Sequence, residues 1–148
     1  MKKLTAAITM TFLVVLSVIV NAQAQSEKPY TEGTVWSVQY VQTKSGMGET
    51  YLKDLSENWV KVVKEAQKEG LIMSYKVLSA QPSAKTDWDL MLLIQFKNYA
   101  DLDGLSDKMD AIAKKVIGNQ DKQHKDAINR NDMRTLLGGK LAQELIFK

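Results

Sequence analysis

The 148-residue chain contains no cysteine and only one histidine, His124. Without cysteine it can form no disulfide bond, iron–sulfur cluster or cysteine-ligated zinc site, and it has no thiol nucleophile. A single histidine likewise excludes metal sites built from several imidazoles. A hard cation held by carboxylates alone is compatible with the composition. Nothing in the sequence requires a cofactor or a metal, so we predict neither, and the fold must be stabilised by its hydrophobic core.

Strong charge of one sign is also missing. The chain has 20 Lys and Arg against 17 Asp and Glu, and two of the cations, Lys2 and Lys3, belong to the N-terminal segment. The rest is nearly neutral, so the calculated pI of about 9.0 does not indicate a basic patch for nucleic acid or an anionic membrane. The sequence also lacks the G-x-S-x-G, P-loop and G-x-G-x-x-G motifs of common catalytic and nucleotide sites.

The first 24 residues follow the order of a secretory signal peptide. Lys2 and Lys3 precede the apolar run Leu4–Val20, and Ala22 and Ala24 then provide the small residues that signal peptidase requires. The run is nearly long enough to span a bilayer, so an uncleaved anchor is the alternative. The Ala-x-Ala sequence favours cleavage. We therefore expect residues 1–24 to be a signal peptide and the mature protein to be periplasmic or secreted, without stable membrane insertion.

After the signal peptide we expect a flexible polar lead, residues 25–33, followed by a single domain, residues 34–148. Residue alternation and helical periodicity divide this domain into strands and helices. The predicted elements are a strand at Thr34–Thr43, a helix from Glu49 to Gly70, strands at Leu71–Leu78 and Asp87–Lys97, a second helix between Asn98 and Gly118 that Gly104 divides, and a last strand at Lys140–Lys148. The polar segment Asn119–Asp132 is interpreted as a surface helix or excursion with little core of its own.

The order strand, helix, strand, strand, helix, strand predicts an α+β, ferredoxin-like βαββαβ fold with a four-stranded antiparallel sheet and helices on one face. We assign five residues to the helix side: Trp88, Leu90, Leu92, Ile94 and Phe96. The other side would carry Val35, Val41, Met91 and Leu93. Periodicity groups residues by face but does not orient the faces. An apolar face left in water predicts that a second copy packs against it.

Two short patterns resemble a known family. Lys44, Gly46, Met47 and Tyr51 form K-x-G-M-x-x-x-Y after the first strand, and W-D-L-M-L begins at Trp88. From about Val35 to the C-terminus the chain resembles the dimeric α/β-barrel group of ferredoxin-like proteins. Within that group it is most similar to small exported bacterial proteins without an assigned function. Many of these relatives have proline where this chain has Ser45, which affects the rigidity of the turn.

The resemblance implies a homodimer formed through the sheet. It does not decide the function, because the wider superfamily includes cofactor-independent monooxygenases, haem-degrading enzymes, lactone isomerases and stress-response proteins. In its enzymatic members, a pocket usually lies between the sheet and the helices of each protomer.

Four aromatic residues are the candidate ligand-binding set: Trp36, Tyr40, Tyr75 and Trp88. If their strands are neighbours, they could line an apolar cavity for a small planar ligand. The alternative, which we favour, is that they fill the core. Trp59 has the same two interpretations, ligand stacking or a core anchor, and the core role is again favoured.

Other candidate chemistry is weaker. His124 lies in the polar sequence QDKQHKDAINR, where a solvated side chain is expected rather than a base or haem ligand. Asp87 and Asp89 flank Trp88 and resemble a carboxylate pair, but two carboxylates without a third ligand are weak evidence for a metal. Catalytic residues are therefore left unassigned.

Two functions remain open. The first is an exported, non-catalytic homodimer that binds a small apolar molecule. The second is a cofactor-independent, monooxygenase-like or isomerase-like enzyme for a small aromatic or apolar substrate, with Ser37, Gln39 or Tyr75 positioning that substrate.

Export makes a direct prediction about the mature N-terminus. Cleavage after Ala24 removes 24 of the 148 residues and leaves a chain that starts at Gln25. Intact mass spectrometry of protein recovered from the periplasm or medium of a bacterial host should give that mass. A chain that keeps residues 1–24, or that starts elsewhere, would contradict the prediction.

Overall fold

The computed structural model describes residues 27–148. The expected signal peptide and its cleavage site lie outside the described residues. By its contacts the chain forms two units, and the larger one, Glu32–Ile146, contains the helices and most of the sheet. In the described part of the smaller unit, the Lys148 amide donates to the Pro29 carbonyl over 3.0 Å, and the Tyr30 ring meets Phe147 edge-on. Between residues 27 and 148, no helix is both long and apolar enough to cross a membrane.

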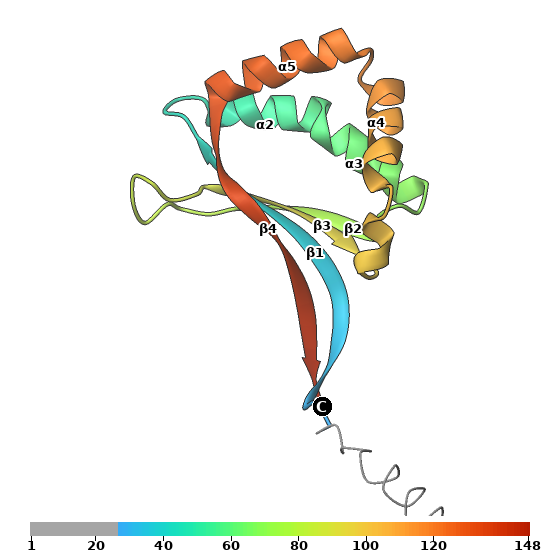
Figure 1. The fold of residues 1–148 in the computed structure, drawn as a ribbon. Helices are drawn as coiled ribbons and strands as arrows, with labels where there is room; N and C mark the ends of the chain where they lie inside the picture. The colour runs from blue at the N-terminus through green and yellow to red at the C-terminus, as the bar shows by residue number, and fades with distance from the viewer. Residues whose placement is uncertain (1–26) are drawn as a thin grey trace, which may run out of the picture. The chain divides into compact units, whose positions relative to one another are not determined.

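The fold is α+β, with one run of helices between the first and second strands and another between the third and fourth. Its elements are β1 (Tyr30–Thr43), α2 (Gly48–Glu57), α3 (Trp59–Lys68), β2 (Ser74–Ser79), β3 (Leu90–Phe96), the 3-10 helix η2 (Tyr99–Leu102), α4 (Leu105–Val116), α5 (Gln120–Met133) and β4 (Arg134–Phe147). The strands form a four-stranded antiparallel sheet in the order β2-β3-β1-β4, which is compatible with the predicted βαββαβ arrangement. Helices α2 to α5 lie over one face of this sheet (Figure 1).

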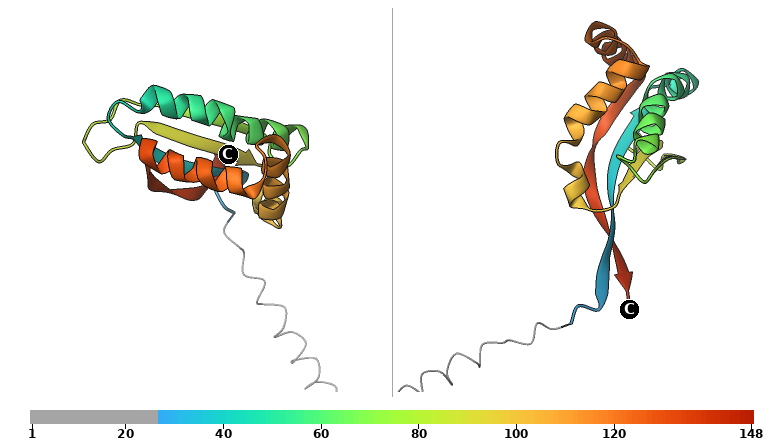
Figure 2. Two further views of the ribbon diagram at one scale, coloured as in Figure 1. Left: turned by 90° about the horizontal axis from the view of Figure 1, so that it is seen from above. Right: turned by 90° about the vertical axis from the view of Figure 1, so that its right-hand side faces the viewer.

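Each predicted helix is interrupted. The first is broken at Asn58, which separates α2 from α3. The second is divided as predicted at Gly104, whose φ of 64° is left-handed and therefore favours glycine. Asn98 caps η2 as expected, because its side chain accepts a hydrogen bond from the Asp101 amide. In space, α4 packs against α3 and α5 runs along α2 (Figure 2).

The register of β1 against β3 decides which side chains face the helices. Val35 pairs with Phe96, and Val41 pairs with Leu90, so these four residues share a face. All four are buried within the core under the helices. The prediction for β3 is confirmed from Leu90 to Phe96.

The predicted orientation of β1 is wrong. Val35 and Val41 were assigned to the face away from the helices, but both are fully buried beneath them. Trp88 was also assigned to the wrong side. It precedes the start of β3 and packs against Tyr40, with ring centroids 5.9 Å apart. The physical reason is that β1 carries apolar side chains on both faces, so its alternation did not orient it.

The sheet surface directed away from the helices is called the open face here. The β1–β3 register places on it Trp36, Val38, Tyr40, Met91 and Leu93. On β2, Leu78 pairs with Met91 and adds another side chain to this face. The open face therefore carries several large apolar and aromatic residues, beside the polar side chains of Lys76 and Gln95.

Several boundaries differ from the prediction. Strand β2 begins at Ser74 rather than Leu71, and β3 begins at Leu90 rather than Asp87. Strand β1 begins at Tyr30, so residues 30–33 belong to it rather than to a flexible lead. Strand β4 begins at Arg134 rather than Lys140, so Gly138 and Gly139 lie inside the strand and not in a turn before it. Gly139 allows a close approach of two backbones, because a Cβ atom there would lie 2.7 Å from the Val38 carbonyl oxygen.

This close approach makes the stability of the fold sensitive to Gly139. We expect Gly139→Ala to lower the free energy of unfolding by about 1–3 kcal/mol, because the added methyl group must push β4 away from β1. Gly48→Ala is the matched control, since its Cβ would meet nothing closer than Thr43 Oγ1 at 3.8 Å. Alanine at this helical position should be neutral or slightly stabilising. Urea unfolding of both variants tests this, and equal stabilities would show that β4 tolerates the methyl group.

Candidate functional site

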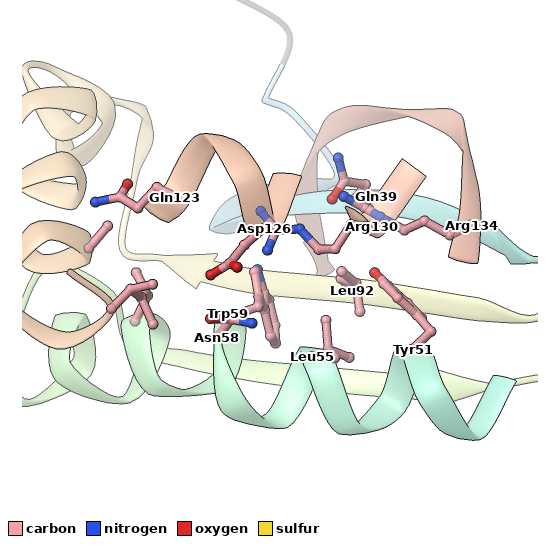
Figure 3. A pocket seen from close by; sticks show the side chains of 13 residues that line it. Gln39, Tyr51, Leu55, Asn58, Trp59, Leu92, Gln123, Asp126, Arg130 and Arg134 are labelled. Carbon is pink, nitrogen blue, oxygen red and sulfur yellow. The ribbon is translucent and has the colours of Figure 1, made fainter. Parts of the chain in front are cut away.

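A cavity of about 220 Å³ lies between the sheet and the helices. Its floor comes from β1 and β3, one wall from α2 and α3, and the opposite wall from α4 and α5 (Figure 3). The residues that line it are Gln39, Tyr51, Leu55, Asn58, Trp59, Val62, Leu92, Ala113, Ile117, Gln123, Asp126, Arg130 and Arg134. We call this cavity the helix-side pocket.

The α5 wall of the pocket is built from a polar helix. Asn119 caps α5, its side chain accepting a hydrogen bond from the Lys122 amide over 3.0 Å. Gln123, Asp126 and Arg130 then recur at steps of three and four, which places them on one face of the helix. Figure 3 shows these three side chains reaching from α5 into the pocket. A helix without an apolar stripe therefore covers part of the sheet.

The opposite wall depends on the break at Asn58. The Asn58 side chain donates to Asp54 Oδ1 over 2.8 Å, and α3 starts at the next residue, Trp59. The Trp59 ring packs edge-on against Tyr75, with 5.7 Å between centroids. Asn58 and Trp59 both line the pocket, so the break brings one polar and one aromatic side chain to the same wall.

Tyr51 and Arg134 are in contact at one end of the pocket. Tyr51 is almost fully buried, and the Arg134 guanidinium carbon lies 5.3 Å from the centre of its ring, within the range of a cation–π contact. Burial raises the pKa of the Tyr51 hydroxyl above its ordinary value, and the positive charge of Arg134 opposes this rise. At neutral pH the hydroxyl is therefore protonated and can donate a hydrogen bond.

The other charged groups around the pocket have partners of opposite sign. Lys122 Nζ lies 2.8 Å from Asp126 Oδ2, and Arg130 Nη1 lies 3.8 Å from Asp54 Oδ2. Two buried polar atoms have no hydrogen-bond partner among residues 27–148: Asp54 Oδ2 and Arg134 Nε. Asp54 has Arg130 as its ionic partner, whereas the Nε–H donor of the Arg134 cation is left without an acceptor.

The pocket has an apolar part and a cationic end. Val62, Ala113 and Ile117 line the part near α3 and α4, and Leu55 and Leu92 continue the apolar surface. Arg130, Arg134, Gln39 and Tyr51 gather at the other end (Figure 3). A pocket with apolar walls and a few convergent polar groups is typical of small-molecule sites.

The four aromatic residues predicted to bind a ligand do not lie together. Trp36, Tyr40 and Trp88 are at the open face, where Lys76 Nζ lies 5.3 Å from the centre of the Trp36 ring. Tyr75 is on the helix side and packs on Trp59. The set is divided by the sheet, so the four side chains cannot line one cavity. Trp59 lines the pocket and also packs against both core clusters.

The other candidate catalytic or metal-binding residues, His124, Asp87 and Asp89, lie outside the pocket lining. His124 is exposed on α5. The Asp87 carboxylate accepts hydrogen bonds from the amide and hydroxyl of Ser83, which together with the Trp88 amide hold its pKa below the usual range. Asp89 accepts from the amide and hydroxyl of Thr43. Asp87 thus holds the loop between β2 and β3 at Ser83, and Asp89 holds the end of β1 at Thr43. Over residues 27–148, no three His, Asp or Glu side chains come together in a group that could hold a metal ion.

Of the residues suggested as substrate-positioning groups, Gln39 lines the pocket. Ser37 lines a neighbouring hollow of about 320 Å³ that shares Gln39, Trp59 and Leu92 with the pocket. The sequence interpretation missed six polar lining residues: Tyr51, Asn58, Gln123, Asp126, Arg130 and Arg134. The signal that could have revealed three of them is the spacing of Gln123, Asp126 and Arg130 at steps of three and four, which puts these polar side chains on one face of a helix that begins at a capping asparagine.

No protein-family model matches this chain, and no curated protein matches it either. The function of the helix-side pocket is therefore argued from its geometry.

Proposed function

We propose that this protein is an exported, non-catalytic, ferredoxin-like domain of the dimeric α/β-barrel type. In this proposal it binds a small, largely apolar molecule in the helix-side pocket and forms a homodimer through its sheet. The observation that carries the binding function is the pocket itself, an apolar space lined by Leu55, Trp59 and Leu92 with polar groups at one end.

The size and lining of the pocket support binding of a small molecule. Its volume of about 220 Å³ is below the range of about 300–1,000 Å³ common for drug-sized ligands. The ligand should therefore be no larger than a single ring or a short chain. Trp59 and Tyr51 offer aromatic surface, and Asn58 and Gln39 offer neutral hydrogen-bonding groups that can orient a ligand.

The chemistry of the lining supports binding rather than catalysis. Among the described residues that line the pocket there is no histidine, serine, cysteine or lysine, the residue types most often used as bases or nucleophiles. The carboxylate of Asp126 is paired with Lys122. The raised pKa of Tyr51 makes its hydroxyl a hydrogen-bond donor rather than a base at neutral pH.

The open face supports the homodimer. Trp36, Tyr40, Met91 and Leu93 share this surface, and Leu78 beside them is 46% exposed. Monomeric proteins rarely expose a large apolar patch of this kind. A second copy packed sheet to sheet would remove it from water, as the resemblance to dimeric α/β-barrel proteins implies.

The pocket makes a direct prediction about binding. Ala113→Leu should fill the apolar part and weaken binding of a neutral single-ring probe, benzyl alcohol, by at least about tenfold. Ala111→Leu is the control, since Ala111 is exposed on the same helix. NMR chemical-shift titration gives the affinity and the site. Absence of saturable shifts around Trp59 and Leu92 in the unchanged protein would overturn the binding function.

The dimer has a test that is independent of the pocket. Leu78→Glu adds a charge to the open face, so we expect the dimer dissociation constant to rise by about tenfold or more. Leu52→Glu on α2 is the matched control, because Leu52 is similarly exposed at 40% but lies outside the sheet. Sedimentation equilibrium distinguishes the two variants. A monomeric unchanged protein at micromolar concentration, or equal effects of both substitutions, would refute a dimer formed through the sheet.

A further inference from the structure

We propose that the helix-side pocket selects a small monocarboxylic acid, whose carboxylate is held by Arg134 and whose apolar body lies against Trp59, Leu55 and Leu92. This inference rests on the proposed binding function and adds the chemical class of the ligand.

The first argument is the charge balance around the pocket. Asp126 is paired with Lys122, and Arg130 lies next to Asp54, whose other oxygen accepts from Asn58. These pairs leave Arg134 as the cation of the pocket lining without a carboxylate partner among the described residues. A single negative charge on a ligand therefore balances the site.

The second argument is the donor left without an acceptor. Arg134 Nε is buried and makes no hydrogen bond within the described chain. A guanidinium presents its N–H groups as a planar fork that matches both oxygens of a carboxylate. Its contact with the Tyr51 ring fixes the guanidinium at the pocket wall. The protonated Tyr51 hydroxyl and the Gln39 amide lie at the same end (Figure 3), where they can donate further hydrogen bonds.

The third argument is the shape of the remaining space. Beyond the cationic end, the lining changes to Leu55, Trp59 and Leu92, and then to small or aliphatic side chains on α3 and α4. An acid with one ring or a short hydrocarbon chain would place its charge at Arg134 and its body along these residues. A dianionic phosphate fits less well, since it would bring a second charge into a largely apolar space.

The experiment compares benzoate with benzamide, which has nearly the same shape but no charge. The full mature chain is titrated with each probe by NMR, and the shifts of Leu92 and Trp59 report the site. We expect benzoate to bind about tenfold or more tightly than benzamide. Arg134→Gln should reduce this ratio to about one while benzamide still binds. Arg134→Lys, which keeps the charge but loses the fork, should give an intermediate ratio.

Lys125→Gln is the matched control, because it removes one positive charge from an exposed position of α5 and should leave the ratio unchanged. Lys140 Nζ lies over the Tyr40 ring at the open face, so loss of the preference in Lys140→Gln rather than in Arg134→Gln would assign the anion to the open face and overturn the role of Arg134. Retention of benzamide binding also shows that the Arg134 variants are folded.

The outcomes separate this inference from the function on which it rests. If benzamide and benzoate bind the unchanged protein equally, the pocket binds small molecules but does not select an acid, and the inference is wrong. If neither probe binds, and benzyl alcohol also fails to bind, both the inference and the binding function are wrong. A preference for benzoate that Arg134→Gln leaves intact would overturn the role of Arg134 alone.

Discussion

The pairing of β1 with β3 is the interaction on which the rest of the structure depends. It sets Val35 opposite Phe96 and Val41 opposite Leu90, which directs the buried side chains of both strands toward the helices. A slip of one residue would exchange the faces of β1. Gln39 would then leave the pocket, and Trp36 and Tyr40 would have to fit beneath the helices. In a chain without cysteine, no disulfide fixes this register, which rests on the backbone ladder and on the packing of the buried side chains.

The pocket follows from how the helices cover that face. Two clusters of buried residues join the sheet to the helices, one around Val63 and Ile112 and the other around Tyr51 and Leu55. Trp59 packs against both clusters. The polar face of α5 cannot fill the space above Leu92, because Gln123, Asp126 and Arg130 carry charge or amide groups that need partners. The result is a cavity lined by both apolar and polar side chains.

The sequence predicted an element correctly where its apolar residues are concentrated on one face of that element. The contrast between the faces of β3 identified Leu90 to Phe96 correctly, and Gly104 and Asn98 have local conformations that their residue types favour. It was insufficient for β1, whose two faces are both apolar, and for Trp88, which precedes the strand whose alternation it was assumed to follow. The pocket was not predictable because its lining comes from elements far apart in the chain, and Arg130 and Asp126 resemble an ordinary solvated helix face.

The central strands give the pocket and the open face a common boundary. Gln39 lines the pocket, and its neighbour Tyr40 lies on the open face, paired with Met91. Leu92 lines the pocket floor, and Leu93 lies on the opposite side. A ligand over Leu92 and a second copy against Leu93 would therefore contact the same two strands from opposite faces. Linkage requires that any effect of dimer formation on ligand affinity be matched by an equal effect of the ligand on dimer affinity.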